Sequence, residues 1–381
     1  MASKSKSLEI HKKHKGKIEI KPKFSISSKE KLSLAYTPGV AEVSKEIAKN
    51  KKMADVYTNK ANQVAIVSDG TAVLGLGDIG PEAGLPVMEG KAAIFKSFAE
   101  VDAVPLCVDT TDVDEIVKFC KQIQPNFAGI NLEDISAPRC FEVLDKLEKE
   151  LSIPVFHDDQ DGTAIVTVAA LMNALKIVNK KKEEIKIVIN GAGAAGIAIA
   201  KLLYFFGIKK IFLLDSKGTI TTKRKDLTEV KKNVALLIGN KEKQKSLEEA
   251  VAGADVFIGV SKEGLLKKSM VKSMKNNPII FAMANPVPEI MPKEAKEAGA
   301  AVMGTGRSDF ANQINNALVF PGIFRGLFDS GKSKVTQQMK VDIAKAVAGV
   351  VKKPNKSRIL PAVTDKKVVK TIAKAVEESR G

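Results

Sequence analysis

Short apolar runs alternate with longer amphipathic stretches along the chain from about residue 64 onward. A short apolar run is typical of a buried strand, and apolar residues at helical spacing are typical of an amphipathic helix. We expect strands at residues 64–67, 104–108, 127–132, 155–156, 185–190, 211–214, 256–260 and 279–283. We expect helices at residues 91–99, 113–123, 139–151, 163–179 and 194–206, and a helical region from residue 337 with a loop around Pro354 and Pro361. Strands that alternate with helices imply parallel sheets, so the pattern predicts an α/β fold.

The length of 381 residues favours two domains. The long apolar helix expected at 163–179 would join them. We expect residues 1–155 to form an N-terminal α/β domain. Residues 156–381 are expected to form a C-terminal Rossmann-type domain, with a doubly wound parallel sheet and further helices at the end of the chain. Residues 1–24 are expected to be an exposed, partly helical lead-in.

The composition bears on location and partners. The net charge of +17 suggests nucleic-acid binding, but only six of the 61 basic residues are arginines. Arginine is the residue that base readout and phosphate recognition favour, so we expect a solvated lysine surface and no nucleic-acid partner. Three cysteines without paired spacing fit a reducing cytoplasm. We find neither a secretory signal nor an apolar stretch that would span a bilayer, and expect no membrane partner.

A glycine-rich loop lies between the strand expected at 185–190 and the following helix. This order is typical of a dinucleotide site, in which the loop approaches the pyrophosphate and the helix N-terminus faces it. Asp215 ends the next strand, where it would bind the adenosine ribose and favour NAD over NADP, although Lys217 and Lys223 weaken that preference. The alternative is a glycine-rich turn that only packs. The expected cofactor-binding residues of the loop are Gly191, Gly193, Ala194, Ala195 and Gly196.

Two acidic pairs follow neighbouring strands. Glu133 and Asp134 follow one, and Asp158 and Asp159 follow the next. Carboxyl ends of parallel strands meet at one sheet edge, where carboxylate oxygens suit Mg²⁺ or Mn²⁺. The alternative is helix capping, because acidic residues are favoured at helix N-termini. His157 is expected to pack beside the site rather than to bind a metal.

Two further residues have candidate chemistry. Lys91 follows Gly90 at the expected start of a helix. A lysine is usually solvated, but a buried lysine near a metal would have a lowered pKa and could act as a base. Tyr36 lies in a turn segment with an exposed phenol, which would ordinarily be structural.

Several separate segments, in order along the chain, resemble the malic enzymes in their short, bacterial-type form. The resemblance extends from about residue 8 to the C-terminus. The segments are Tyr36–Ala41, Gly75–Gly80, Glu89–Lys91, Glu133–Ile135, His157–Gln160 and Asn312–Asn316.

The resemblance implies oxidative decarboxylation of L-malate to pyruvate and CO₂ with NAD(P) and a divalent metal, by a homodimer. The N-terminal domain would hold substrate and metal. By resemblance, Tyr36 is the general acid and Lys91 the general base, accompanied by Asp158. The implied metal ligands are Glu133, Asp134 and Asp159, and the implied substrate-binding residues are Asn285 and Asn316, with Asn315 close by; Asn285 is also expected beside the cofactor.

The sequence departs from the family at two places. No arginine follows Gly70, where the long form has a substrate-binding arginine, and Asp161 replaces the histidine usual in bacterial members. Two rival functions stay open. An amino-acid dehydrogenase would share the two-domain plan and a catalytic lysine but need no metal. A non-catalytic protein could use the Rossmann unit to sense NAD and its lysines to bind nucleic acid.

Overall fold

The computed structural model describes residues 2–73 and 75–380. The first of its two sheets has four parallel strands in the order β2-β1-β3-β4. The strands are β1 (Gln63–Ser68), β2 (Asp102–Cys107), β3 (Gly129–Leu132) and β4 (Val155–His157). The helices that connect them are α5 (Gly80–Ala99), α6 (Val113–Ile123) and α7 (Arg139–Glu150). Short 3₁₀ turns η3 (Gln124–Asn126) and η2 (Asn59–Asn62) precede β3 and β1.

The second sheet has the order β10-β9-β8-β5-β6-β7. Five strands are parallel, and the two-residue β7 pairs antiparallel with β6. The strands are β5 (Lys186–Asn190), β6 (Lys210–Asp215), β7 (Gly218–Thr219), β8 (Val256–Gly259), β9 (Ile279–Ala282) and β10 (Val302–Thr305). The helices are α9 (Ala194–Phe205), α10 (Glu229–Ile238), α11 (Leu247–Val251), α12 (Lys268–Lys272) and α13 (Pro292–Glu297).

Both faces of the second sheet are covered by apolar cores. Ile187 and Ile189 of β5 belong to the core that continues through α9 into the first sheet, whereas Val188 between them belongs to a separate core under α11, α12 and α13. Successive strand residues point to opposite faces, so one strand contributes to both cores. The predicted doubly wound α/β class is confirmed, with β7 as the one antiparallel addition among the described strands.

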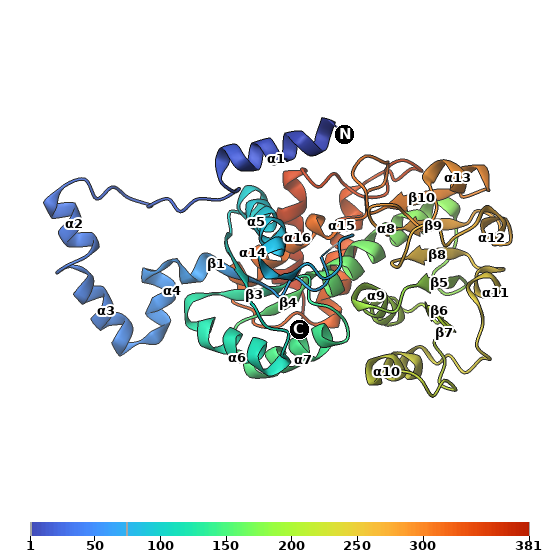
Figure 1. The fold of residues 1–381 in the computed structure, drawn as a ribbon, viewed down its shortest axis with the longest axis horizontal. Coiled ribbons are helices and arrows are strands. Elements are labelled where there is room, and N and C mark those ends of the chain that lie inside the picture. Colours follow the sequence, from blue (N-terminus) through green and yellow to red (C-terminus); the bar gives the residue numbers. More distant parts are fainter. Residues whose placement is uncertain (1, 74, 381) are drawn as a thin grey trace.

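The last helices of the chain return to the first sheet. They are α14 (Phe320–Ser330), α15 (Gln337–Val350) and α16 (Lys366–Glu378). Phe95 of α5 packs on Phe320 and Phe324 of α14, with ring centroids 4.6 and 5.3 Å apart. Figure 1 shows α14 and α16 beside α5, in the middle of the molecule. The division of the chain between residues 155 and 156 stays a prediction.

The N-terminal residues form a series of short helices that the apolar pattern did not predict beyond the lead-in. They are α1 (Ala2–His14), α2 (Lys29–Ala35), α3 (Val40–Lys49), η1 (Lys51–Met53) and α4 (Ala54–Tyr57). Figure 1 shows α2 and α3 projecting away from both sheets. We call residues 18–57 the arm from here on.

Two other expectations were wrong. Helix α5 begins at Gly80, not at Lys91. Its first half contains Pro81, Gly84 and Pro86, residues that normally weaken a helix, but Pro81 lies in the first turn where its missing N–H costs nothing. The second is that no apolar stretch is long enough to span a bilayer. The segment Asp158–Val178, which contains α8 (Thr163–Val178), is long and apolar enough by length and composition. However, 78% of its most apolar stretch is buried inside the protein, where α8 packs against α9 and α15 as a core helix.

Candidate active site

The acidic residues that follow β3 and β4 lie together, as predicted. One carboxylate oxygen from each of Glu133, Asp134 and Asp159 lies within 4.8 Å of the other two. Asp134 has a left-handed backbone with φ of +53°, and its N–H donates to Asp159 Oδ2 at 2.8 Å. Asp159 belongs to η4 (Asp158–Gly162), a single π-helical turn between β4 and α8. We call Glu133, Asp134, Asp158 and Asp159 the acidic edge.

The acidic edge fits a divalent cation. Asp134 Oδ2 is buried and has no hydrogen-bond partner in the described part of the chain. Burial, reinforced by the charge of Asp159, raises the pKa of Asp134 to about 8 and the pKa of Glu133 well above its ordinary value. Carboxylates held this close resist ionisation without a positive partner, and three converging oxygens are ligands that Mg²⁺ and Mn²⁺ accept. Helix capping does not account for an unpartnered buried oxygen.

Lys91 reaches the acidic edge from α5. Its Nζ lies 2.5 Å from Asp158 Oδ2, forms an ion pair with Glu133, and lies 4.3 Å from the ring centroid of Phe320. Burial lowers the pKa of Lys91, but the charges of Asp158 and Glu133 outweigh burial, and the net pKa lies above the ordinary value. The lowered pKa that we expect beside a bound metal therefore stays a prediction, and in the described structure Lys91 is the cation that balances the acidic edge.

His157 and Asp158 are fully buried behind this edge. Neither ring nitrogen of His157 has a hydrogen-bond partner among the described residues, and Nδ1 lies 3.8 Å from Asp159 Oδ2. Burial lowers the pKa of His157, so the ring is neutral, in keeping with a packing role. Burial raises the pKa of Asp158 to about 6 despite its contact with Lys91.

Arg139, the first residue of α7, is a candidate that the sequence reasoning missed. Its Nη2 donates to Asp69 Oδ2 and to Thr71 Oγ1, each at 3.0 Å, and its Nε has no partner in the described structure. The resemblance places the arginine of the long form at Thr71 or Ala72, directly after Gly70. Arg139 thus brings a guanidinium to that place from another element. Its position at a helix start, five residues after Asp134, was the available signal.

The glycine loop has the shape that a dinucleotide site needs. A Cβ on Gly191 would lie 2.6 Å from the carbonyl oxygen of Val260, and a Cβ on Gly196 would lie 1.7 Å from that of Gly191. Both positions therefore require glycine. Gly193 faces open space, which leaves the backbone free for close approach by a pyrophosphate. Ala194 and Ala195 form the first turn of α9, whose N-terminal N–H groups point to the same place.

Asp215 ends β6 as predicted, but it is not free. Arg224 donates to both of its oxygens, at 2.8 and 3.2 Å, and Lys231 Nζ donates to Oδ2 at 2.8 Å. Burial opposes the charge of Asp215, yet these two cations hold its pKa below the ordinary value. The prediction that Asp215 repels a 2′-phosphate overlooked both cations, because Arg224 and Lys231 lie nine and 16 residues further along the chain.

The three asparagines differ in placement. Asn315 caps η5 (Asn316–Leu318), accepting from the N–H of Ala317 at 2.8 Å, so its side chain is in use. Asn316 lies beside η4, with its Cβ 3.1 Å from the position of a Cβ on Gly162. Asn285 follows β9, and its amide donates to the carbonyl of Met283 at 3.3 Å. Asn316 is thus placed next to the acidic edge, and Asn285 at the end of the second sheet.

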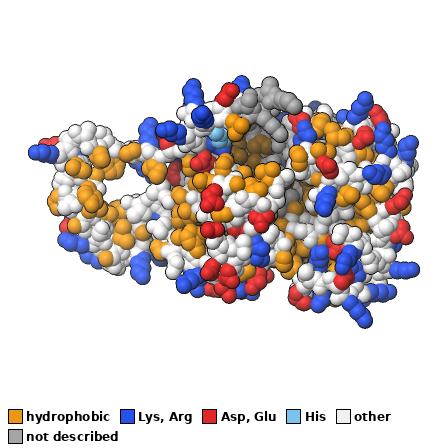
Figure 2. Space-filling view, viewed as in Figure 1, with side chains coloured by type: hydrophobic (Ala, Val, Ile, Leu, Met, Phe, Trp, Pro, Cys, Tyr) orange, Lys and Arg blue, Asp and Glu red, His pale blue; other side chains and the backbone are white. Residues whose placement is uncertain are grey.

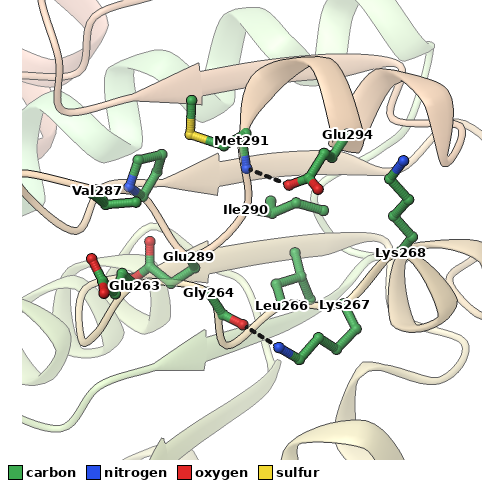
Figure 3. Close-up of a pocket in the computed structure, with 11 residues that line it drawn as sticks. Glu263, Gly264, Leu266, Lys267, Lys268, Val287, Glu289, Ile290, Met291 and Glu294 are labelled. Atoms are coloured by element: carbon green, nitrogen blue, oxygen red, sulfur yellow. Dashed lines mark hydrogen bonds between the residues drawn. The ribbon is translucent and has the colours of Figure 1, made fainter.

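A second residue missed from the sequence supports the loops at that end. Glu289 is fully buried, and its carboxylate accepts from the N–H groups of Ser261 at 3.0 Å and Ala284 at 3.1 Å. It therefore ties the loop after β8 to the loop after β9, next to Asn285. Figure 3 shows Glu289 at the wall of a cavity of about 710 Å³ between these loops.

Tyr36 is the one predicted catalytic residue that the chain does not bring to the acidic edge. It follows α2 on the arm, is 68% exposed, and lies on the part of the molecule that projects away from α5.

Comparison with known proteins decides the family. Residues 15–148 match the malic enzyme N-terminal domain, and residues 160–380 match the malic enzyme NAD binding domain. The chain belongs to the malic enzyme family. It is 53% identical to the bifunctional malic/malolactic enzyme of Bacillus subtilis, with 100% of this chain and 93% of that protein aligned. It is also 53% identical to the NAD-dependent malic enzyme of Geobacillus stearothermophilus, over 96% of this chain and 76% of that protein.

The fold agrees with that of solved malic enzymes. The crystal structure of the NAD-dependent malic enzyme from Thermotoga maritima superposes with a TM-score of 0.94 at 47% identity, covering 98% of this chain and 99% of that one. Relatives include NADP-dependent malic enzymes as well, among them that of Escherichia coli at 45% identity, which aligns with 87% of this chain and 44% of its own length.

Proposed function

We propose that this malic enzyme family member catalyses oxidative decarboxylation of L-malate to pyruvate and CO₂, with reduction of NAD⁺ or NADP⁺ and a requirement for Mg²⁺ or Mn²⁺. The observation that carries the proposal is the buried contact of Lys91 with Asp158 and Glu133, beside three carboxylates that converge on one point. A metal-independent amino-acid dehydrogenase has no use for that convergence, and a sensor has no use for the lysine.

Each residue has a distinct proposed part. Glu133, Asp134 and Asp159 would hold the metal. When bound, the metal supplies Lewis-acid polarisation of the substrate oxygen, and the nicotinamide supplies a hydride acceptor. Lys91 takes the proton of the C2 hydroxyl, held in place by Asp158. Lys91 must first lose its own proton, and engagement of Glu133 with a cation removes one of the two charges that now oppose that loss.

The substrate carries two carboxylates that need positive or hydrogen-bonding partners. We propose Arg139 for one of them, because its Nε is unpartnered and Thr71 and Asp69 fix its orientation. Asn285 and Asn316 are proposed to complete the substrate site. The glycine loop and Asp215 are proposed to hold the dinucleotide, and Arg224 and Lys231 make a 2′-phosphate acceptable there.

Tyr36 is proposed to protonate C3 after loss of CO₂, and to do so in a second copy of the chain. The arm that carries it exposes apolar side chains that a monomer would leave in water, which supports a homodimer. Exchange of an identical segment between two copies is a low-cost route to a dimer. Figure 2 shows apolar side chains along the arm; those exposed are Ile18, Ile20, Phe24, Ile26, Leu32, Leu34, Tyr36, Val40, Val56 and Tyr57.

The activity is tested with purified protein, L-malate, Mn²⁺ and either NAD⁺ or NADP⁺. Reduced cofactor is followed by absorbance, and the acid formed is identified with and without EDTA. Pyruvate formed only with metal supports the proposal and ranks the two cofactors. Oxaloacetate as sole product would indicate a plain malate dehydrogenase, and no turnover with any combination would remove the proposed activity.

We further propose a cytoplasmic location, on the evidence of the three unpaired cysteines.

The role of Tyr36 is tested by mixing two inactive variants, Tyr36→Phe and Lys91→Met, after dissociation and reassembly. If Tyr36 serves the partner copy, each mixed dimer has one site with both residues intact, and a 1:1 mixture recovers about a quarter of wild-type activity. If Tyr36 serves its own chain, every site in the mixed dimer lacks one residue and activity stays at the level of the separate variants. A molecular mass by light scattering identifies the dimer.

A further inference from the structure

Contacts with several other elements hold the η4 turn in place. Asp158 contacts Lys91 of α5, and Asp159 accepts from the N–H of Asp134. Gln160 donates to the carbonyl of Cys140 in α7 at 3.3 Å. Asp161 forms an ion pair with Lys340 of α15, with 2.7 Å between Nζ and Oδ1. Two catalytic candidates therefore sit on a turn that is anchored at its other residues.

The Asp161–Lys340 pair is buried between η4 and the helices α7, α9 and α15. Asp161 is 8% exposed and Lys340 is 6% exposed. The pair lies beside a cavity of about 160 Å³, whose wall includes Ile197 and Ala198 of α9. Among the described residues, Lys340 is the one basic side chain in ion-pair contact with Asp161. A buried charge that loses its partner is strongly unfavourable, so the two side chains depend on each other.

The charge around η4 shows what Lys340 balances. The turn carries three acidic residues within four positions, next to Glu133 and Asp134. Lys91 contacts Asp158 and Glu133 but makes no ion pair with Asp161, which Lys340 alone engages in the described structure. Without Lys340, the charge of Asp161 would repel its neighbours in the same turn, and either the turn would move or Asp161 would take up a proton.

We propose that Lys340 is a positioning residue for the metal site: by neutralising the buried charge of Asp161, it keeps the η4 turn in the conformation that places Asp159 beside Glu133 and Asp134. Lys340 touches neither the metal nor the substrate in this scheme. The inference rests on the proposed metal site, and it makes the last third of the chain part of that site's support.

The test measures Mn²⁺ binding rather than turnover, by the electron paramagnetic resonance signal of free Mn²⁺ in a titration of full-length protein. Loss of a direct partner of a metal ligand typically weakens metal binding about 10- to 100-fold, and since Lys340 acts one residue further out, through Asp161, we expect Lys340→Met to weaken Mn²⁺ binding about tenfold. Lys340→Arg, which keeps the charge, should stay near wild type. The control is Lys345→Met, on the same helix, where Lys345 is 57% exposed and pairs with Asp342.

A double variant protects the test against misfolding. Asp161→Asn with Lys340→Met removes both charges, and we expect it to fold and to recover most of the Mn²⁺ affinity that Lys340→Met loses. If wild-type protein binds Mn²⁺ and Lys340→Met binds it with the same affinity, the role of Lys340 is overturned but the proposed metal site is not. A double variant that binds Mn²⁺ as weakly as Lys340→Met overturns it as well. Wild-type protein that binds no Mn²⁺ overturns the proposed metal site and, with it, the role of Lys340.

Discussion

The carboxyl edges of the two sheets contain the same kind of residue in opposite electrostatic settings. At the first sheet, Glu133, Asp134, Asp158 and Asp159 crowd together, and Lys91 is the cation in contact with them. At the second sheet, Asp215 binds both Arg224 and Lys231, and Arg224 also pairs with Asp226, which Lys217 contacts as well. The first cluster has more carboxylates than cations, whereas the second has more cations than carboxylates.

The difference shows that an acidic residue at a strand end does not by itself define a ligand. The cations that contact the acidic residue determine which ligand it can bind, and they come from other elements of the chain. Lys91 arrives from α5, and Lys231 arrives from α10. An edge with surplus carboxylate attracts a divalent cation, whereas a carboxylate already bound by two cations tolerates a phosphate close by.

The largest expected effect comes from reducing the charge of the first edge. Asp159→Asn or Glu133→Gln should abolish the response to Mn²⁺ and lower kcat. Lewis-acid polarisation contributes several kcal/mol, on the order of a thousandfold in turnover. The measurement is kcat over a range of Mn²⁺ concentrations. Asp114→Asn is the matched control, since Asp114 is exposed and pairs only with Lys146 among the described residues. If these variants keep the wild-type kcat at the Mn²⁺ concentrations that saturate the wild-type protein, the acidic edge does not bind the catalytic metal and has only a structural role.

A smaller effect is expected from the guanidinium beside that edge. Arg139→Met should raise KM for L-malate more than it lowers kcat, because it removes a charged partner of a substrate carboxylate. Such charge-assisted hydrogen bonds contribute about 1.5–3 kcal/mol, or roughly 10- to 100-fold in KM. Steady-state kinetics at saturating NAD⁺ give the two constants. A fall in kcat and in melting temperature with unchanged KM would assign Arg139 to support of Asp69 alone.

The second edge should respond through cofactor choice. Lys231→Met leaves Asp215 with one cation, so KM for NADP⁺ should rise about tenfold, the loss of one charged contact, while KM for NAD⁺ changes little. The ratio of kcat/KM for the two cofactors is the readout. An equal change for both cofactors would mean that Lys231 only holds Asp215 and does not face the 2′ position.

How far the sequence predicted these two edges follows from the range of the interactions. Apolar runs and strand order are local, and they placed Glu133, Asp134, Asp158 and Asp159 correctly at one edge. The glycine loop was equally local, because Gly191 and Gly196 are required by contacts within their own β-turn-α unit and its neighbouring strand. The family, the first sheet and the second sheet except its two outer strands β7 and β10 were therefore predictable.

Interactions between residues that are far apart in the sequence were not predictable. No spacing rule connects Arg139 to Asp69, or Lys340 to Asp161. The arm escaped for another reason: helices α2 and α3 have no buried residues, so their apolar positions do not mark a core within this chain. Tyr36 was assigned by resemblance alone. A sequence pattern does not say whether a residue contributes to the site of its own chain or to that of a second copy, so the position of Tyr36 away from the acidic edge could not be predicted.

The smallest expected effect distinguishes direct contact from general charge at the second edge. Lys217 lies two residues after Asp215, but its Nζ pairs with Asp226 and is 66% exposed. Exposed ion pairs contribute about 0–1 kcal/mol because water and salt screen them, so Lys217→Met should change KM for NADP⁺ by less than about fivefold. Lys231→Met, in contrast, removes a cation in direct contact with Asp215. If both variants raise KM for NADP⁺ equally, and added salt reduces both effects, the positive field of the whole surface selects the cofactor. If only Lys231→Met does so, the contact with Asp215 is what separates the second edge from the first.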